Sequence, residues 1–143
     1  MPDMHPCQLV DAGFVDAARH RYSNSVDLAI TPEQLFEVLE DADAWPRWAK
    51  VITKVTWTSP PPRGVGTTRV VDMRGGLVGD EEFLLWEPPT RMAFRFNASS
   101  EKTVQAFAES TTSSGPPRAA GSPGPSRSTS QGRRDGWCRW GSR

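Results

Sequence analysis

The composition of this chain changes abruptly at Ser110, and the change limits how much of the chain can fold. From Ser110 to Arg143 the sequence has no Val, Ile, Leu, Met, Phe or Tyr, and 24 of these 34 residues are Ser (8), Arg (6), Gly (6) or Pro (4). A segment of this kind buries too little apolar surface to offset the entropy lost on ordering. We therefore expect residues 110–143 to form a disordered tail.

The formal net charge of zero combines an acidic body with a basic tail. Residues 1–109 carry 11 basic and 16 acidic side chains, a net charge of −5, whereas residues 110–143 carry 6 basic and 1 acidic, a net charge of +5. An acidic body argues against a specific nucleic-acid-binding domain, which would present a basic face. Only the tail could bind polyanions, and then weakly.

Several classes of protein are disfavoured by what the sequence lacks. Cys7 and Cys138 lie near opposite ends of the chain, without the spacing of a zinc or redox site. No stretch approaches the roughly 18–20 apolar residues that span a membrane. Residues 1–21 do not resemble a secretory signal, and Pro2, Pro6 and Gly13 favour a loose extension over a short helix there. We expect a cytoplasmic, reduced protein without a metal or cofactor.

Residue patterns predict the order of the elements. Alternation predicts a strand over Tyr22–Ile30. Thr31-Pro32-Glu33-Gln34 has the residues of a capping box and predicts a helix that ends near Glu40–Asp43, with a second helical turn at Pro46. Further strands are expected over Val51–Trp57, Gly66–Met73, Leu77–Trp86, Arg91–Asn97 and from Lys102 to Ala108, with a hairpin turn at Gly75-Gly76. This order predicts an α+β fold with a curved antiparallel sheet.

Four motifs in this order resemble one family. Thr31-Pro32-Glu33-Gln34-Leu35-Phe36, Trp45-Pro46-Arg47-Trp48, Gly64-Val65-Gly66-Thr67 and Trp86-Glu87-Pro88-Pro89-Thr90-Arg91-Met92 are similar to motifs of the START-like superfamily. The closest part of it is the polyketide cyclase/dehydrase and lipid-transport-like proteins, also called SRPBCC proteins. The resemblance covers about Tyr22–Glu109. It implies a helix-grip fold, in which a bent antiparallel sheet wraps a long C-terminal helix around an apolar cavity.

The chain departs from this pattern after Glu109, where the resemblance implies two more strands and the gripping helix. We therefore expect a loose extension over 1–21, an incomplete START-like domain over 22–109 and a tail over 110–143. Suitable GC-rich codons for Ser110–Ser130 can be read in a shifted frame as strand, turn and strand, so we favour a frameshift over a natural disordered tail. In an out-of-frame tail, Trp137, Arg139 and Trp140 are accidents of the codons, although such a group could also stack on single-stranded nucleic acid.

No catalytic residue can be assigned from the sequence. His5 and His20 lie in or beside the extension, so acid–base chemistry would fall to carboxylates. Glu81 shares a face with Phe83 and Leu85 if β alternation holds, and either Glu81 or Asp72 could point toward a cavity; we favour a solvated position for both. Trp45 and Trp48 could cap a pocket, and we favour a packing role. The residues expected to line a ligand site are Trp48, Val70, Phe83, Leu85, Phe94 and Phe96.

Three functions remain open at this stage. The resemblance implies binding or transport of an apolar small molecule such as a lipid, polyketide or quinone-like compound, impaired in this truncated chain. The alternative is a polyketide cyclase or aromatase, which would need polar groups inside the cavity; a buried carboxylate with a strongly raised pKa would favour it. The third is an interaction protein that pairs through its sheet edge, for which a large exposed apolar patch would argue. The ligand and the oligomeric state do not follow from the sequence.

Overall fold

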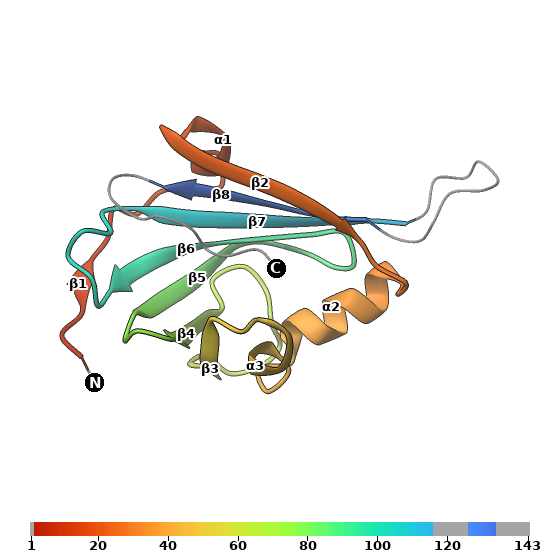
Figure 1. The fold of residues 1–143 in the computed structure, drawn as a ribbon, viewed down its shortest axis with the longest axis horizontal. Helices are drawn as coiled ribbons and strands as arrows, with labels where there is room; N and C mark the ends of the chain where they lie inside the picture. The colour runs from red at the N-terminus through yellow and green to blue at the C-terminus, as the bar shows by residue number, and fades with distance from the viewer. Residues whose placement is uncertain (1, 116–125, 134–143) are drawn as a thin grey trace.

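A strongly curved antiparallel sheet forms the body of the molecule, and two helices lie against one of its faces (Figure 1). The computed structural model describes residues 2–115 and, as backbone only, the strand over 126–133. The eight-stranded sheet has the order β2-β8-β7-β6-β5-β4-β3, and β1 pairs with β6 beside this path. The strands are β1 (His5–Pro6), β2 (His20–Asp27), β3 (Ile52–Trp57), β4 (Thr68–Met73), β5 (Val78–Glu87), β6 (Arg91–Ser99), β7 (Phe107–Ser114) and β8 (Ser126–Arg133).

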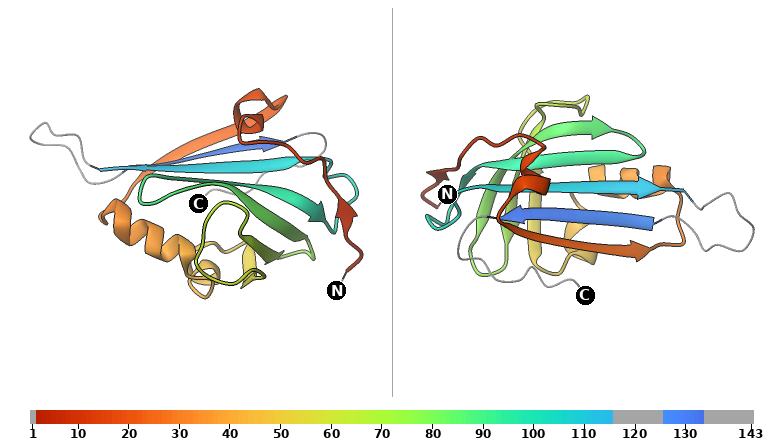
Figure 2. Two further views of the ribbon diagram at one scale, coloured as in Figure 1. Left: turned by 180° about the vertical axis from the view of Figure 1, so that it is seen from behind. Right: turned by 90° about the horizontal axis from the view of Figure 1, so that it is seen from above.

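The helices lie on opposite faces of the sheet. Helices α2 (Pro32–Glu40) and α3 (Trp45–Trp48) lie on the concave face, and α1 (Phe14–Ala17) lies on the other face over β7 and β8 (Figure 2). The α+β class and the antiparallel meander expected from the sequence are confirmed. The expected absence of a C-terminal helix concerns residues 134–143, which lie outside the described residues.

The predicted capping box starts α2. The Thr31 hydroxyl accepts a hydrogen bond from the Gln34 backbone N–H at 3.1 Å, and the Gln34 side chain accepts one from the Thr31 N–H at 2.9 Å. Pro32 occupies the first turn, where its missing N–H has no cost. The helix buries Leu35, Phe36 and Leu39 against the sheet. Thr31-Pro32-Glu33-Gln34 therefore forms the helix start predicted from the sequence.

The turn between β4 and β5 is also as predicted. Gly75 and Gly76 have φ values of 89° and 87°. Side chains with a Cβ rarely adopt this conformation, so the glycine pair permits the tight turn. The strands that it joins pair from Thr68↔Glu82 to Asp72↔Val78.

The strand register shifts at three places, once between β3 and β4 and twice between β5 and β6, and two of these shifts bear on the predicted faces. In β3 the register shifts between Ile52 and Lys54, so Ile52 and Val55 are both buried, although simple alternation places them on opposite faces. In β5 the register shifts between Phe83 and Leu85. Bulges insert one residue into one strand and reverse the alternation beyond it. The sequence prediction of the faces was therefore wrong beyond each bulge.

The N-terminal segment is packed against the sheet, so the expected loose extension over residues 2–18 is corrected. β1 pairs with the end of β6, and the Cys7 and Gln8 N–H groups donate to the carbonyls of Asn97 and Gln105 at 2.9 and 2.8 Å. Cys7 joins the core cluster and Val15 is buried. Pro6 is tolerated because it ends the two-residue strand β1, and Gly13 occupies the N-cap of α1.

The chain continues as a strand through Ser110, where we expected the domain to end. β7 begins at Phe107 and runs to Ser114, and it pairs with β6 as far as Arg91↔Thr112. β8 then pairs with both β7 and β2. Ser and Thr can supply backbone hydrogen bonds to a sheet without adding apolar surface, and Thr suits strands. Residues 116–125 and 134–143, including Cys138 and the tryptophans of the tail, lie outside the described residues, and the frameshift remains a hypothesis.

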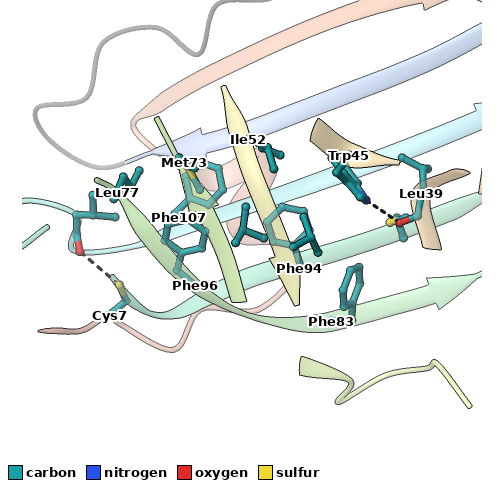
Figure 3. Packing of buried hydrophobic residues seen from close by; sticks show 14 of the residues in the cluster. Cys7, Leu39, Trp45, Ile52, Met73, Leu77, Phe83, Phe94, Phe96 and Phe107 are labelled. Atoms are coloured by element: carbon teal, nitrogen blue, oxygen red, sulfur yellow. Dashed lines mark hydrogen bonds between the residues drawn. The ribbon is translucent and has the colours of Figure 1, made fainter. Parts of the chain in front are cut away.

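A single cluster of buried apolar side chains fills the space between the concave face and α2 and α3 (Figure 3). The residues at its centre come from several elements, and they include Leu35, Phe36, Leu39, Trp45, Val55, Val71, Met73, Phe83, Met92, Phe94, Phe96 and Phe107. β2 contributes little to the core, since all eight of its residues are exposed. The core is therefore built mainly on β3–β7.

The closest contact across β5 and β6 gives a test of this packing. A Cβ added at Gly79 would lie 2.5 Å from Cζ of the Phe96 ring. We expect Gly79→Ala to lower the free energy of unfolding by about 1–3 kcal/mol, measured by urea unfolding, because the ring must move. Gly64→Ala is the control, since no heavy atom lies within 4 Å of its added Cβ. Equal effects of the two substitutions would contradict the packing.

Candidate functional site

A buried ion pair joins β4 and β5 within the apolar core. Arg69 and Glu81 lie directly opposite each other in the strand register. Nε of Arg69 donates to Oε2 of Glu81 at 2.5 Å, and the two side chains are only 2% and 4% exposed. Burying two charges costs several kcal/mol per ion, which mutual attraction repays only in part. The pair is therefore the most unusual feature of this core.

The alternation of side chains along β4 and β5 explains why both partners face inward. In β4, Arg69, Val71 and Met73 alternate with half-buried residues and point to the core. In β5, Glu81 and Phe83 share the inward face, and Glu81 lies opposite Phe96 of β6. Asp72 lies on the other face of β4, as we favoured. The solvated position favoured for Glu81 was wrong. Alternation along β5 places Glu81 on the concave face with Phe83, and this face is buried in the core.

Four aromatic rings surround the Arg69 guanidinium. Its Cζ lies 4.9 Å from the ring centroid of Phe83, 5.0 Å from Trp45, 5.1 Å from Phe94 and 5.5 Å from Trp57. We call these four residues the aromatic cage. Cations over aromatic faces are attracted by the ring quadrupole, and more so when desolvated. The cage compensates part of the cost of burying Arg69.

The C-terminal end of α2 holds two of these rings in place. The Trp45 indole N–H donates to the Leu39 carbonyl at 3.0 Å (Figure 3), and the Trp57 indole N–H donates to the Glu40 carbonyl at 3.0 Å. The last carbonyls of a helix have no partner within the helix. The two indoles therefore satisfy α2 and, in the same geometry, present their rings to Arg69.

One donor of the guanidinium has no partner. Nη1 of Arg69 is buried and makes no hydrogen bond with any part of the chain that the structure describes. A buried donor left unpaired costs about 1–3 kcal/mol, and more when it is charged. The hydroxyl of Ser113, on β7, is the other buried side-chain atom without a partner among the described residues. An unpaired charged donor among aromatic side chains is unusual in a core that serves stability alone.

The pKa of the Glu81 carboxyl group lies near neutral pH. Burial raises the pKa of Glu81 to about 7, against the lowering effect of the Arg69 charge and hydrogen bond. The charges of Glu109 and Asp80 raise it further. Alternation along β7 places Glu109 on the inward face with Phe107, opposite Phe94. Burial also raises the pKa of Asp80, with the Glu82 charge as a second cause.

The residues expected to line a ligand site lie at different depths. Phe83, Phe94 and Phe96 are buried in the core cluster, and Phe83 and Phe94 belong to the aromatic cage. Trp48 is 38% exposed and its ring lies 4.5 Å from that of Trp45. Trp45 has the packing role that we favoured.

Like Trp48, two more of the expected lining residues lie outside the core cluster. Val70 is half-buried on the face of β4 opposite Arg69 and Val71. Leu85 is turned away by the bulge in β5, and Trp86 takes its place against Phe83 and Phe36, at 5.0 and 5.3 Å between ring centroids.

Arg69 was missed in the sequence reasoning. The sequence did contain a signal for it. Alternation along β4 puts Arg69 on the same face as Val71 and Met73, so a charged residue lies on the apolar face of a strand. That pattern is rare unless the charge is paired. Among residues 2–115, no group of three or more His, Cys, Asp or Glu could hold a metal ion, and no described helix is long and apolar enough to cross a membrane.

The raised pKa of Glu81 predicts a specific dependence of stability on pH. A pKa of about 7 in the folded chain lies above the ordinary value of 4.5, so the folded state holds this proton more tightly than the unfolded state. The stabilisation is complete below pH 4.5 and is lost as pH rises to 7. Relative to Glu81→Gln, we expect the unfolding free energy of the chain to fall by an amount on the order of 3 kcal/mol between pH 4.5 and 7.5.

Urea unfolding of both proteins across this range measures the difference. Glu82→Gln serves as the control, because Glu82 lies on the opposite face of the same strand, where Arg95 and Asn97 contact it. Parallel pH curves for the chain and for Glu81→Gln would contradict the assignment.

Solved structures share this fold at low sequence identity. A START superfamily protein from Mycobacterium smegmatis superposes with a TM-score of 0.66 at 12% identity, over 85% of this chain and 81% of that one. Protein MLL2253 from Mesorhizobium loti gives a TM-score of 0.62 at 19% identity over 81% and 78% of the two chains. Ara h 8.0201 gives 0.58 at 12% identity over 84% and 82%. These likenesses establish the fold, with its antiparallel sheet and short N-terminal helices.

The solved structures show the fold, whereas sequence relatives and a family model identify the family. The uncharacterized proteins Rv2574 of Mycobacterium tuberculosis (strain H37Rv) and Mb2604 of Mycobacterium bovis are each 68% identical to this chain over 106 residues, 74% of this chain and 64% of the relative. The chain thus spans 64% of the length of these curated relatives. The family model described as polyketide cyclase / dehydrase and lipid transport matches residues 19–140. The chain therefore belongs to the polyketide cyclase/dehydrase and lipid transport family.

Proposed function

We propose that this chain binds an apolar small molecule, of the lipid, polyketide or quinone-like kind, against the concave face of its sheet. The observation that carries the proposal is Nη1 of Arg69, a buried charged donor without a partner inside the aromatic cage. A core selected only for stability gains from replacing such a group by an apolar side chain. Membership of a lipid-transport family supports the same conclusion.

A line of contacts leads from solvent to this donor. Trp48 is partly exposed and packs on Trp45, whose ring stands 5.0 Å from the Arg69 guanidinium. Both tryptophans belong to α3, which is only four residues long. A short helix held by few hydrogen bonds opens at lower cost than the strands around it. We place the entry of the ligand at α3, with Phe83, Phe94 and Phe96 as the apolar wall beyond it.

Substitution of Arg69 tests the proposal. We expect Arg69→Met to weaken binding of 2-acetonaphthone about 10-fold or more, because a hydrogen bond to a charged donor is worth roughly 1.5–3 kcal/mol. Ligand-observed NMR gives the affinities. Arg63→Met is the matched control, since the Arg63 guanidinium also stacks on Trp57, at 4.2 Å, but lies in the loop before β4. Equal weakening by both substitutions would contradict the role of Arg69.

The same titration tests whether binding is impaired in this chain. The chain spans 64% of the length of Rv2574, and we expect it to bind 2-acetonaphthone more weakly than Rv2574 does. Failure of both proteins to bind any naphthalene probe would overturn the proposal itself. Tighter binding by the shorter chain would contradict the expected impairment only.

A polyketide cyclase or aromatase is the second candidate, and the near-neutral pKa of the buried Glu81 favours it. A carboxylate with a pKa near the working pH suits general base and then acid catalysis. Glu81 would take a proton from the carbon between two ketone groups while Arg69 stabilises the enolate oxygen. The enolate carbon then forms a bond to a second carbonyl carbon, and Glu81 returns the proton to the alkoxide formed there. The new C–C bond closes the ring, and loss of the resulting hydroxyl as water, with a proton from the neighbouring carbon, then forms a carbon–carbon double bond.

Turnover of a linear poly-β-ketone thioester decides between binding and catalysis. A cyclase gives a product lighter by one water, detected by mass spectrometry, with a rate that rises with pH through about 7 as Glu81 loses its proton. We expect Glu81→Gln to abolish this rate and Glu82→Gln to preserve it. An unchanged rate in Glu81→Gln would exclude Glu81 as the base, and absence of any product from the unsubstituted chain leaves the binding function alone.

A further inference from the structure

The ion pair leaves one donor nitrogen of the Arg69 guanidinium without a partner among the described residues. Glu81 accepts from Nε through Oε2, whereas Nη1 makes no hydrogen bond there. Charge-assisted hydrogen bonds are roughly twice as strong as neutral ones. Nη1 is therefore suited to a ligand oxygen, and to an anionic oxygen most strongly.

We infer that the ligand is an apolar ring compound with one carboxylate, that this carboxylate binds Nη1 of Arg69 within the aromatic cage, and that Glu81 takes up a proton on binding. The inference rests on the proposed binding function and adds the chemical class of the ligand. The ring part is suited to the four aromatic side chains that lie around the guanidinium.

The charge balance of the site requires the proton. The groups that act on Glu81 are Arg69 from β4, Asp80 from its own strand and Glu109 from β7, one cation against two further carboxylates. With Glu81 ionised, Arg69 and Glu81 form a neutral pair, and a ligand carboxylate would add an uncompensated buried charge. Such a charge is very costly in an apolar environment. When Glu81 is protonated, the positive charge of Arg69 pairs with the ligand carboxylate instead, and the buried site remains neutral.

Glu81 can supply this response near neutral pH. Its pKa of about 7, raised chiefly by burial, means that the proton is gained at little cost there. A further anion beside it raises this pKa again. Binding of a carboxylate and protonation of Glu81 therefore favour each other, as linkage requires.

Three naphthalenes that differ in one group test the inference: 2-naphthoic acid, 2-acetonaphthone and 2-methylnaphthalene. Calorimetric titrations of the full chain at pH 8 in two buffers of different ionisation heat count the protons. We expect 2-naphthoate to bind with uptake of about one proton and its Kd to rise about 10-fold from pH 6 to pH 8, given a Glu81 pKa of about 7. Binding of the two neutral compounds should cause no proton uptake by the protein, and their Kd values should not change with pH.

The outcomes separate this inference from the function on which it rests. Binding of 2-naphthoate without proton uptake, or with weaker affinity than the ketone at both pH values, would overturn the inference and leave apolar ligand binding intact. If none of the three compounds binds, the proposed function fails, and this inference with it.

Two carboxylates on the same strand supply the matched variants. Glu81→Gln should remove the proton uptake and the pH dependence while 2-naphthoate still binds. Glu82→Gln should leave both unchanged, since Glu82 faces Arg95 and Asn97 on the other side of the sheet. The proton count on the unsubstituted chain decides the question even if Glu81→Gln does not fold.

Discussion

The pairing of Arg69 with Glu81 across β4 and β5 is the interaction on which the concave core depends. Burying these two charges costs several kcal/mol per ion, and their mutual attraction offsets part of this cost only when the two side chains lie against each other. The register that sets the two side chains opposite each other therefore cannot slip by a residue. The same register places Phe83 and Phe94 around the guanidinium.

The ion pair also connects the sheet to its helices. Trp45 and Trp57 each donate to a carbonyl at the end of α2 and each present a ring to Arg69. The two indoles therefore link the guanidinium to the C-terminal end of α2 and, through Trp45, to α3.

Local signals in the sequence were accurate where a single turn or cap decides the structure. Thr31 with Gln34 started α2, and Gly75-Gly76 closed the β4–β5 hairpin, as their chemistry predicts. Errors arose where the period of two is broken. The bulge near Leu85 packed Trp86 against the core, and the one near Ile52 put Ile52 and Val55 on one face. Bulges depend on the pairing of two strands, so one strand's sequence does not reveal them.

Caps, turns and alternation act over a few residues, so they were enough to predict the α+β class, the order of most elements and the family resemblance. Tertiary structure decided the site. Alternation shows that Arg69 shares a face with Val71 and Met73, but only the assembled sheet decides which face is covered. Strand pairing alone brought Arg69 to Glu81 and carried β7 past Ser110 to Ser114. Burial, and with it the raised pKa of Glu81, is a property of the whole fold and not of any segment.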